Sequence, residues 1–352
     1  MWCKLMRNQK AEKKVKAESP KKRLWAVKRL TQRDLEILFG LHKMRTLTIK
    51  QIHDTYFSNN GKGYTYLRLH QLKMAGLVEC WPLVNEEGRK NGACYCNTDK
   101  GINILIERGL IDSTGSKRNT IIRKSSKNRP SKRIRKSIIE HNGIFLALEN
   151  VGWEYIEQRD YKRIRGLNRG SVIKGGIKSI DGKEYALYIL EKTPREFTLE
   201  KIIFELKNSS LKNIIILMKG KRYYNQIVND KQIINEELNI LPFRIGVKIL
   251  KRFPSEASIV KLFTSLGEVS IVRNRHMFGK YVVTTRTGEQ KYICNYLLGD
   301  EMAIRFLKKY TWDRYELDGK KVVLFIWDNQ FLELGKGYEH VEIVQIPFDI
   351  QV

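Results

Sequence analysis

Three acidic side chains flank one strongly apolar segment, and carboxylates could hold a metal ion for phosphodiester cleavage. Asp181 and Glu184 lie before residues 185–190 (YALYIL), and Glu191 follows them. The apolar run predicts a strand. At strand rise, Glu184 and Glu191 lie roughly 20 Å apart, so the two carboxylates cannot share one ion. We therefore expect no catalytic and no metal-binding residue in this segment.

Other residues with reactive side chains also lack the spacing that their chemistry needs. Tyr223-Tyr224 follows two basic residues and is a candidate nucleophile pair for DNA nicking, but the chain has no H-x-H pair to hold the metal of a tyrosine relaxase. Cys94 and Cys96 lack a second Cys/His pair at zinc spacing, which favours reduced thiols. No G-x-x-x-x-G-K-[ST] loop occurs, and we expect no cofactor.

Positive charge is the strongest compositional feature. Lysine and arginine number 66 against 38 acidic residues, for a formal net charge of +28. Residues 1–29 form a basic tail, and half of residues 117–136 (KRNTIIRKSSKNRPSKRIRK) are basic with no acid among them. Such clustering predicts a polyanionic partner, and double-stranded DNA is the expected one. Within the basic linker 113–136, the expected phosphate contacts are Lys132, Arg133 and Arg135.

A helix predicted within residues 61–79 (GKGYTYLRLHQLKMAGLVE) carries the side chains expected to read the DNA. Leu69, Leu72 and Gly76 share one face with Thr65 and are expected to pack inward. Arginine and glutamine can bind base edges in pairs of hydrogen bonds, and lysine and tyrosine can hold phosphates. The DNA-binding residues expected on this helix are Lys62, Tyr64, Thr65, Arg68 and Gln71, with all but Thr65 facing outward.

Capping residues, and a change in the sequence pattern from helical to extended, define the elements that must position this helix. Thr31 and Thr48 each precede an amphipathic segment, with Asp34 and Gln51 three residues further on, which predicts two capped helices. Residues 77–81 and 93–96 read as strands joined by a polar loop, with Arg89 and Lys90 at its tip. Thr98 then caps another helix. The ordered set predicts a winged helix-turn-helix domain over 30–112, with Arg89 and Lys90 along the adjacent DNA backbone or in the minor groove.

This set of segments resembles the N-terminal half of the replication-relaxation family. The strings that carry the resemblance are LTQRDLEILFGL, LTIKQIHDTYF, YLRLHQLKMAGLVE and YCNTDKGINIL, within about residues 30–111. These are proteins of Gram-positive plasmids and other mobile elements, associated with plasmid replication and DNA relaxation. The resemblance implies recognition of a replication or transfer origin, with Arg68 and its helix as the DNA reader.

Two α/β blocks are predicted behind the basic linker, at 137–253 and 254–352. The first block is expected to open with a helix that is broken or bent near Gly143, followed by a strand over 153–161, and the second block to contain a helix over 301–314. Each block then shows strand, helix and strand in turn, which suggests a parallel pair with a crossover and a duplicated unit. In the resembled family the first block looks like a restriction-endonuclease-like fold. Gly175-Gly176 stands where such a nuclease needs an acid, and Thr193 stands where it needs a lysine. We therefore expect a degenerate nuclease-like domain.

Taken together, these features predict an α/β chain with an N-terminal winged helix and two α/β units. The expected function is sequence-specific DNA binding in replication initiation or DNA relaxation of a plasmid, phage or other mobile element. A winged-helix transcriptional regulator and a metal-dependent DNA-nicking nuclease are the alternatives. No run of 18 apolar residues occurs, so a cytoplasmic protein without membrane contact is expected. Homodimerisation is left open.

Overall fold

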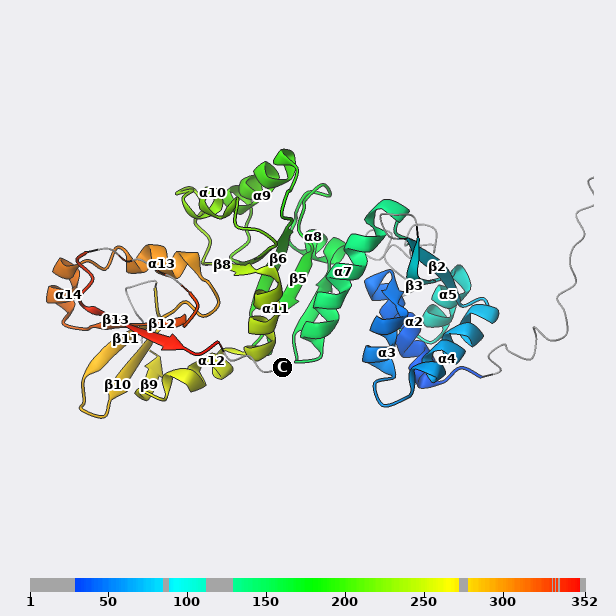
Figure 1. The fold of residues 1–352 in the computed structure, drawn as a ribbon, viewed down its shortest axis with the longest axis horizontal. Helices are drawn as coiled ribbons and strands as arrows, with labels where there is room; N and C mark the ends of the chain where they lie inside the picture. Colours follow the sequence, from blue (N-terminus) through cyan, green and yellow to red (C-terminus); the bar gives the residue numbers. More distant parts are fainter. Residues whose placement is uncertain are drawn as a thin grey trace, which may run out of the picture. The chain divides into compact units, whose positions relative to one another are not determined.

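The chain folds into two compact units, Met1–Asn142 and Gly143–Val352 (Figure 1). The computed structural model describes residues 29–84, 89–111, 129–271, 278–330, 332, 334 and 336–348. This part of the chain is mixed α/β, with 12 helices and three sheets. None of its helices combines the length and apolar character that crossing a bilayer requires.

In its described residues up to position 111, the first unit has helices packed around a small antiparallel sheet. Its elements are α2 (Gln32–Met44), β1 (Leu47–Thr48), α3 (Ile49–Tyr56), α4 (Lys62–Met74), β2 (Val78–Val84), β3 (Lys90–Asn97) and α5 (Asp99–Glu107). The strand order is β1-β3-β2, so the two-residue strand β1 adds to the hairpin that follows α4. The predicted order of helices and strands is present, and the short strand β1 is additional.

Local capping explains where these helices begin and end. The Thr31 side chain accepts from the amide of Asp34, whose carboxylate accepts from the Thr31 amide at 2.7 Å. Thr48 and Gln51 form the same reciprocal pair at the start of α3. Gly76 follows α4 with a φ of 71°, a conformation that glycine adopts without a Cβ clash. The predicted caps at Thr31 and Thr48 are confirmed. The prediction that Gly76 packs inward with Leu69 and Leu72 is wrong, because Gly76 lies beyond the end of the helix and is exposed.

The second unit opens with a five-stranded sheet. Its elements are α7 (Lys132–Glu149, which contains the boundary between the units), β4 (Glu154–Glu157), α8 (Gln158–Ile164), β5 (Gly175–Lys178), β6 (Glu184–Leu190), α9 (Glu196–Asn208), β7 (Asn213–Met218), α10 (Tyr224–Val228), β8 (Glu237–Pro242) and α11 (Phe243–Arg252). The order is β4-β5-β6-β7-β8, with the β6–β7 and β7–β8 pairs parallel and the others antiparallel. The parallel crossover predicted between residues 185 and 220 is confirmed.

A second five-stranded sheet repeats this arrangement. Its elements are α12 (Glu256–Phe263), β9 (Gly267–Ile271), β10 (Tyr281–Thr285), β11 (Gln290–Asn295), α13 (Glu301–Leu307), α14 (Trp312–Asp318), β12 (Val322–Trp327) and β13 (Val341–Ile346). The spatial order again follows the chain from β9 to β13, with two antiparallel pairs and then two parallel pairs. The two sheets therefore share one topology, which supports the suggested duplication.

Three secondary-structure predictions differ from the structure. The helix expected over 301–314 is two helices, α13 and α14, separated around Tyr310. The strand expected over 153–161 ends at Glu157, and α8 follows because the Glu157 side chain accepts from the Arg159 amide at 2.7 Å and caps a new helix. Helix α7 continues through Gly143, where a break was expected.

The two sheets of the second unit are joined through the backbone beside Asp300. Its carboxylate accepts from the amides of Leu238, at the start of β8, and Met302, in α13, at 3.1 and 3.0 Å. Burial raises the pKa of this carboxyl to about 7. Gly299 has a φ of 66°, and a Cβ there would lie 2.6 Å from the carbonyl oxygen of Ile240. The contact requires glycine because the two backbones meet directly.

Candidate nucleic-acid interface

Helix α4 presents a continuous exposed stripe, which we call the α4 outer face. Its members are Lys62, Tyr66, His70 and Lys73, spaced three or four residues apart, with Leu67 beside Tyr66 on the same side of the helix. Tyr66 is 58% exposed and Leu67 is 41% exposed, although both are large residues that could fill a core. The helix carries no acidic residue. The stripe is thus cationic at its ends and apolar in its middle.

Arg68 does not face outward as predicted. Its Nε donates to one carboxylate oxygen of Asp34 at 2.7 Å, and Nη2 donates to the other, so the pair is bidentate. The Asp34 side chain is 1% exposed and that of Arg68 is 16% exposed. The expectation that Arg68 reads bases is therefore corrected, because its guanidinium joins α4 to the start of α2.

The remaining donors of Arg68 are also used within the unit. Nη1 donates to the side-chain oxygen of Gln71 at 2.9 Å, and Nη2 also contacts the Arg29 carbonyl at 3.3 Å. Gln71, which was expected to read bases beside Arg68, is half-buried and serves as its acceptor. Burial alone would raise the pKa of Asp34, but hydrogen bonds from Arg68 and Thr31 outweigh burial and lower it.

The three other residues predicted to bind DNA from α4 differ in their exposure. Thr65 is fully buried, and its hydroxyl lies 2.9 Å from Nδ1 of His53 in α3. The prediction that Thr65 contacts DNA is corrected, because this side chain packs α4 against α3. Tyr64 is exposed and meets the ring of Phe57 edge-on, with 5.6 Å between ring centroids. Lys62 and Tyr64 remain available at the surface.

The hairpin and the start of α7 supply further basic residues. Arg89 and Lys132 are exposed. The guanidinium of Arg135 lies 5.2 Å from the ring centroid of Trp81 on β2, so this cation packs on the hairpin through an aromatic face. The side chains of Lys90 and Arg133 and the segments 85–88 and 112–128 lie outside the described residues, and with them most of the basic linker.

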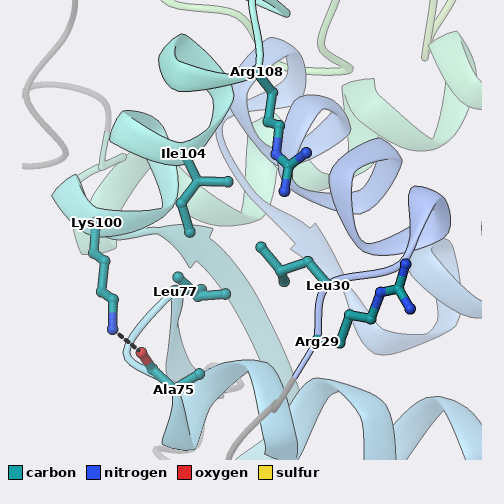
Figure 2. Close-up of a pocket in the computed structure, with 7 residues that line it drawn as sticks. All are labelled: Arg29, Leu30, Ala75, Leu77, Lys100, Ile104 and Arg108. Atoms are coloured by element: carbon teal, nitrogen blue, oxygen red, sulfur yellow. Dashed lines mark hydrogen bonds between the residues drawn. The ribbon is translucent and has the colours of Figure 1, made fainter.

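A hollow of about 460 Å³ opens beside the C-terminal end of α4 (Figure 2). Its lining residues are Arg29, Leu30, Ala75, Leu77, Lys100, Ile104 and Arg108. Figure 2 shows the leucine and isoleucine side chains in the middle and the Arg108 guanidinium reaching in from the end of α5. Lys100 donates to the Ala75 carbonyl at 3.0 Å. Lys100 thus has a backbone partner, and Arg108 places a cation over the apolar side chains (Figure 2).

Lys62 is the one member of the α4 outer face that was predicted from the sequence. Tyr66, Leu67, His70 and Lys73 were not predicted, although the helical period contained the signal. At 100° per residue, the inward positions Thr65, Leu69 and Leu72 place Leu67 on the opposite side of the helix. The same angle of 100° per residue places Arg68 at the edge of the buried face. Arg68 was predicted to face outward because arginine can bind base edges. Its position relative to the buried residues of the helix was not taken into account. The hollow had no such signal, because its lining comes from three distant segments.

The acids that flank β6 are held in separate contacts. Glu184 pairs with Arg165 at 2.6 Å, at the start of the strand. Glu191 pairs with Lys219 at 2.9 Å, beyond the other end. Asp181 accepts from a backbone amide at the start of α12. The three carboxylates therefore bind three different partners, and the β6 residues between them are apolar apart from the Tyr185 and Tyr188 hydroxyls.

Tyr224, one of the two candidate nucleophiles, has an acidic partner. Its hydroxyl donates to the buried Glu301 carboxylate at 2.6 Å, and the Tyr296 hydroxyl donates to the same oxygen at 2.5 Å. Burial, followed by the charge of Glu301, raises the pKa of Tyr224. A nucleophilic phenol needs the opposite shift, so this geometry suits packing between α10 and α13.

A supercoiled plasmid is expected to stay supercoiled when incubated with the full chain and Mg²⁺ or Mn²⁺, because the β6 acids do not converge. Agarose electrophoresis of the treated plasmid measures this directly. Nicking that disappears in Glu191→Gln or Tyr224→Phe would contradict the expectation and identify the responsible residue. Nicking that survives both substitutions would point to a contaminating nuclease.

Comparison of the chain with protein-family models, with curated proteins and with solved structures finds no match. The resemblance of residues 30–111 to the replication-relaxation family therefore stays a prediction.

Proposed function

We propose that the chain is a sequence-specific DNA-binding protein, with the first unit acting as a winged helix-turn-helix domain and α4 lying in the major groove. The observation that carries this proposal is the α4 outer face. It is an exposed, acid-free helix face with a lysine at each end, supported from behind by α2 and α3 and followed directly by a hairpin. The net charge of +28 supports a polyanionic partner.

The spacing of the two lysines agrees with this geometry. Lys62 and Lys73 lie eleven residues apart, which corresponds to roughly 16 Å along a helix. A major groove is about 12 Å wide, so the two ammonium groups can reach the phosphates on its opposite sides. Phosphate contacts of this kind set the position of a helix in the groove and leave the reading of sequence to the residues between them.

The proposal also includes where the DNA site lies. The segments that resemble the replication-relaxation family make an origin of replication or transfer on a mobile element the expected location of the DNA site. In this setting the two sheets of the second unit form a degenerate nuclease-like pair that holds no cutting site and serves as a scaffold. Mapping the DNA bound in cells tests the setting: sites at an origin support it, and sites confined to promoters favour a transcriptional regulator.

Lys62→Ala combined with Lys73→Ala is expected to weaken binding to all DNA sequences about equally. Each lost phosphate contact should flatten the dependence of log K on log salt by roughly one unit, or about two units for the pair. The measurement is the dissociation constant at a series of salt concentrations, with a site selected by the full chain from random duplexes.

The matched control is Lys231→Ala with Lys248→Ala, which removes two exposed lysines from the second unit. This variant carries the same net charge as the first, so it separates a local contact from a general loss of charge. Equal flattening in both variants would show that α4 is not the DNA-binding element. Failure to select any duplex sequence would refute the proposed function itself.

A further inference from the structure

The hydrogen-bonding groups expected to read bases on α4 are used inside the protein. The Arg68 guanidinium is bound by Asp34, and the side-chain oxygen of Gln71 accepts from Arg68. Between the two end lysines, the α4 outer face carries Tyr66, Leu67 and His70. Two of these three side chains, Tyr66 and Leu67, offer apolar surface to a base.

Tyr66 and Leu67 are adjacent, exposed and placed in the first half of the helix. In helix-turn-helix proteins, the N-terminal part of the recognition helix approaches the base edges. The apolar feature that a base presents in the major groove is the methyl group at C5 of thymine, and aliphatic or aromatic side chains contact it. An exposed leucine beside an exposed tyrosine would gain by covering such methyl groups, because apolar surface is then removed from water.

We propose that Leu67 and Tyr66 recognise thymine methyl groups, so the DNA site contains T·A pairs that are read by methyl contact instead of by paired hydrogen bonds. This inference rests on the proposed function. The lysines at the two ends of the same face provide the charge complementarity to a duplex, and Thr65, Leu69 and Leu72 on the opposite face fix the rotation of the helix. That rotation turns Leu67 away from the core.

Replacing thymine by deoxyuridine tests the proposal on the unaltered protein. The exchange removes one methyl group and leaves base pairing intact. The full chain first selects its site from random duplexes, and each thymine of that site is then exchanged singly. At one or two positions the dissociation constant is expected to rise about fourfold, the effect of one methyl group withdrawn from an apolar contact.

Leu67→Ala identifies the side chain that makes the contact. At the thymine facing Leu67, the variant should bind the thymine and deoxyuridine duplexes equally, because the partner of the methyl group is gone. Lys73→Ala is the control: it should weaken both duplexes and leave their ratio as in the unaltered chain. Leu67 is exposed, so both variants should keep the same melting temperature.

Three negative outcomes separate a failure of the methyl-contact inference from a failure of the proposed function. Specific binding with no effect of any thymine exchange would overturn the methyl-contact inference and leave the proposed function standing. A deoxyuridine effect that persists unchanged in both Leu67→Ala and Tyr66→Ala would also overturn it, because the methyl group would then be read elsewhere. Absence of specific duplex binding would instead refute the proposed function.

Discussion

Asp34→Ala is expected to destabilise the first unit by about 3–4 kcal/mol. The substitution leaves the Arg68 guanidinium partly buried without its carboxylate, and removing one member of a buried ion pair typically costs about 3–5 kcal/mol. The lower part of that range applies because 16% of the Arg68 side chain reaches solvent. Loss of the contacts from Asp34 to Thr31 adds to the effect, because the capping box of α2 is broken.

Hydrogen exchange measured on peptides from α2 and α4 reports this loss within the first unit, so that unfolding of the second unit does not obscure it. Glu36→Ala removes an exposed acid from the same helix and is the matched control. The double variant Asp34→Ala with Arg68→Met should lose less stability than the sum of the two single variants. The double variant no longer contains a partly buried guanidinium without a carboxylate partner. Strict additivity would contradict a direct Asp34–Arg68 coupling.

The same ion pair predicts a pH dependence. The pKa of Asp34 is lowered in the folded chain, so its contribution to stability is fully present above the ordinary aspartate range. That contribution is lost as the pH falls through the depressed folded pKa. The stability difference between the unaltered chain and Asp34→Ala should therefore narrow below about pH 4.

Glu205→Ala is expected to destabilise the second unit by about 3–5 kcal/mol. This carboxylate lies on α9 and accepts from the Ser171 hydroxyl at 2.8 Å, the Val172 amide at 3.1 Å and the Tyr188 hydroxyl at 2.9 Å. Each donor left without an acceptor in the interior costs roughly 1–3 kcal/mol, and the amide and hydroxyls cannot all find new partners. The site therefore joins α9, β6 and the loop before β5.

Glu200→Ala is the matched control, because Glu200 is an exposed acid on the same helix. Glu205→Gln should lose less than Glu205→Ala, since the amide oxygen can still accept and the two hydroxyls can rotate. Hydrogen exchange in peptides from β6 and α9 measures each effect. An equal, small change in Glu200→Ala and Glu205→Ala would show that this buried network contributes little.

Local features of both units could be predicted from the sequence because they depend on residues close together in the chain. Thr31 with Asp34, and Thr48 with Gln51, cap their helices through contacts three residues apart. The apolar run at 185–190 forms β6, which is buried at all but its first residue. A strand followed by a helix and a parallel strand allows few arrangements, so the β6–α9–β7 crossover also followed from order alone.

Contacts between residues far apart in the chain determined the features that the sequence did not predict. Asp34 and Arg68 are 34 residues apart, and the capping pattern at Thr31 contained no sign that the same carboxylate would also bind an arginine of α4. The repeated topology of the two sheets likewise emerged only from strand pairing. The sequence by itself determined the order of the main elements of the first unit, the caps of α2 and α3 and the excess of positive charge. The tertiary structure decided which of the charged and apolar side chains of α4 remain exposed, because burial and ion pairing depend on what packs against the helix.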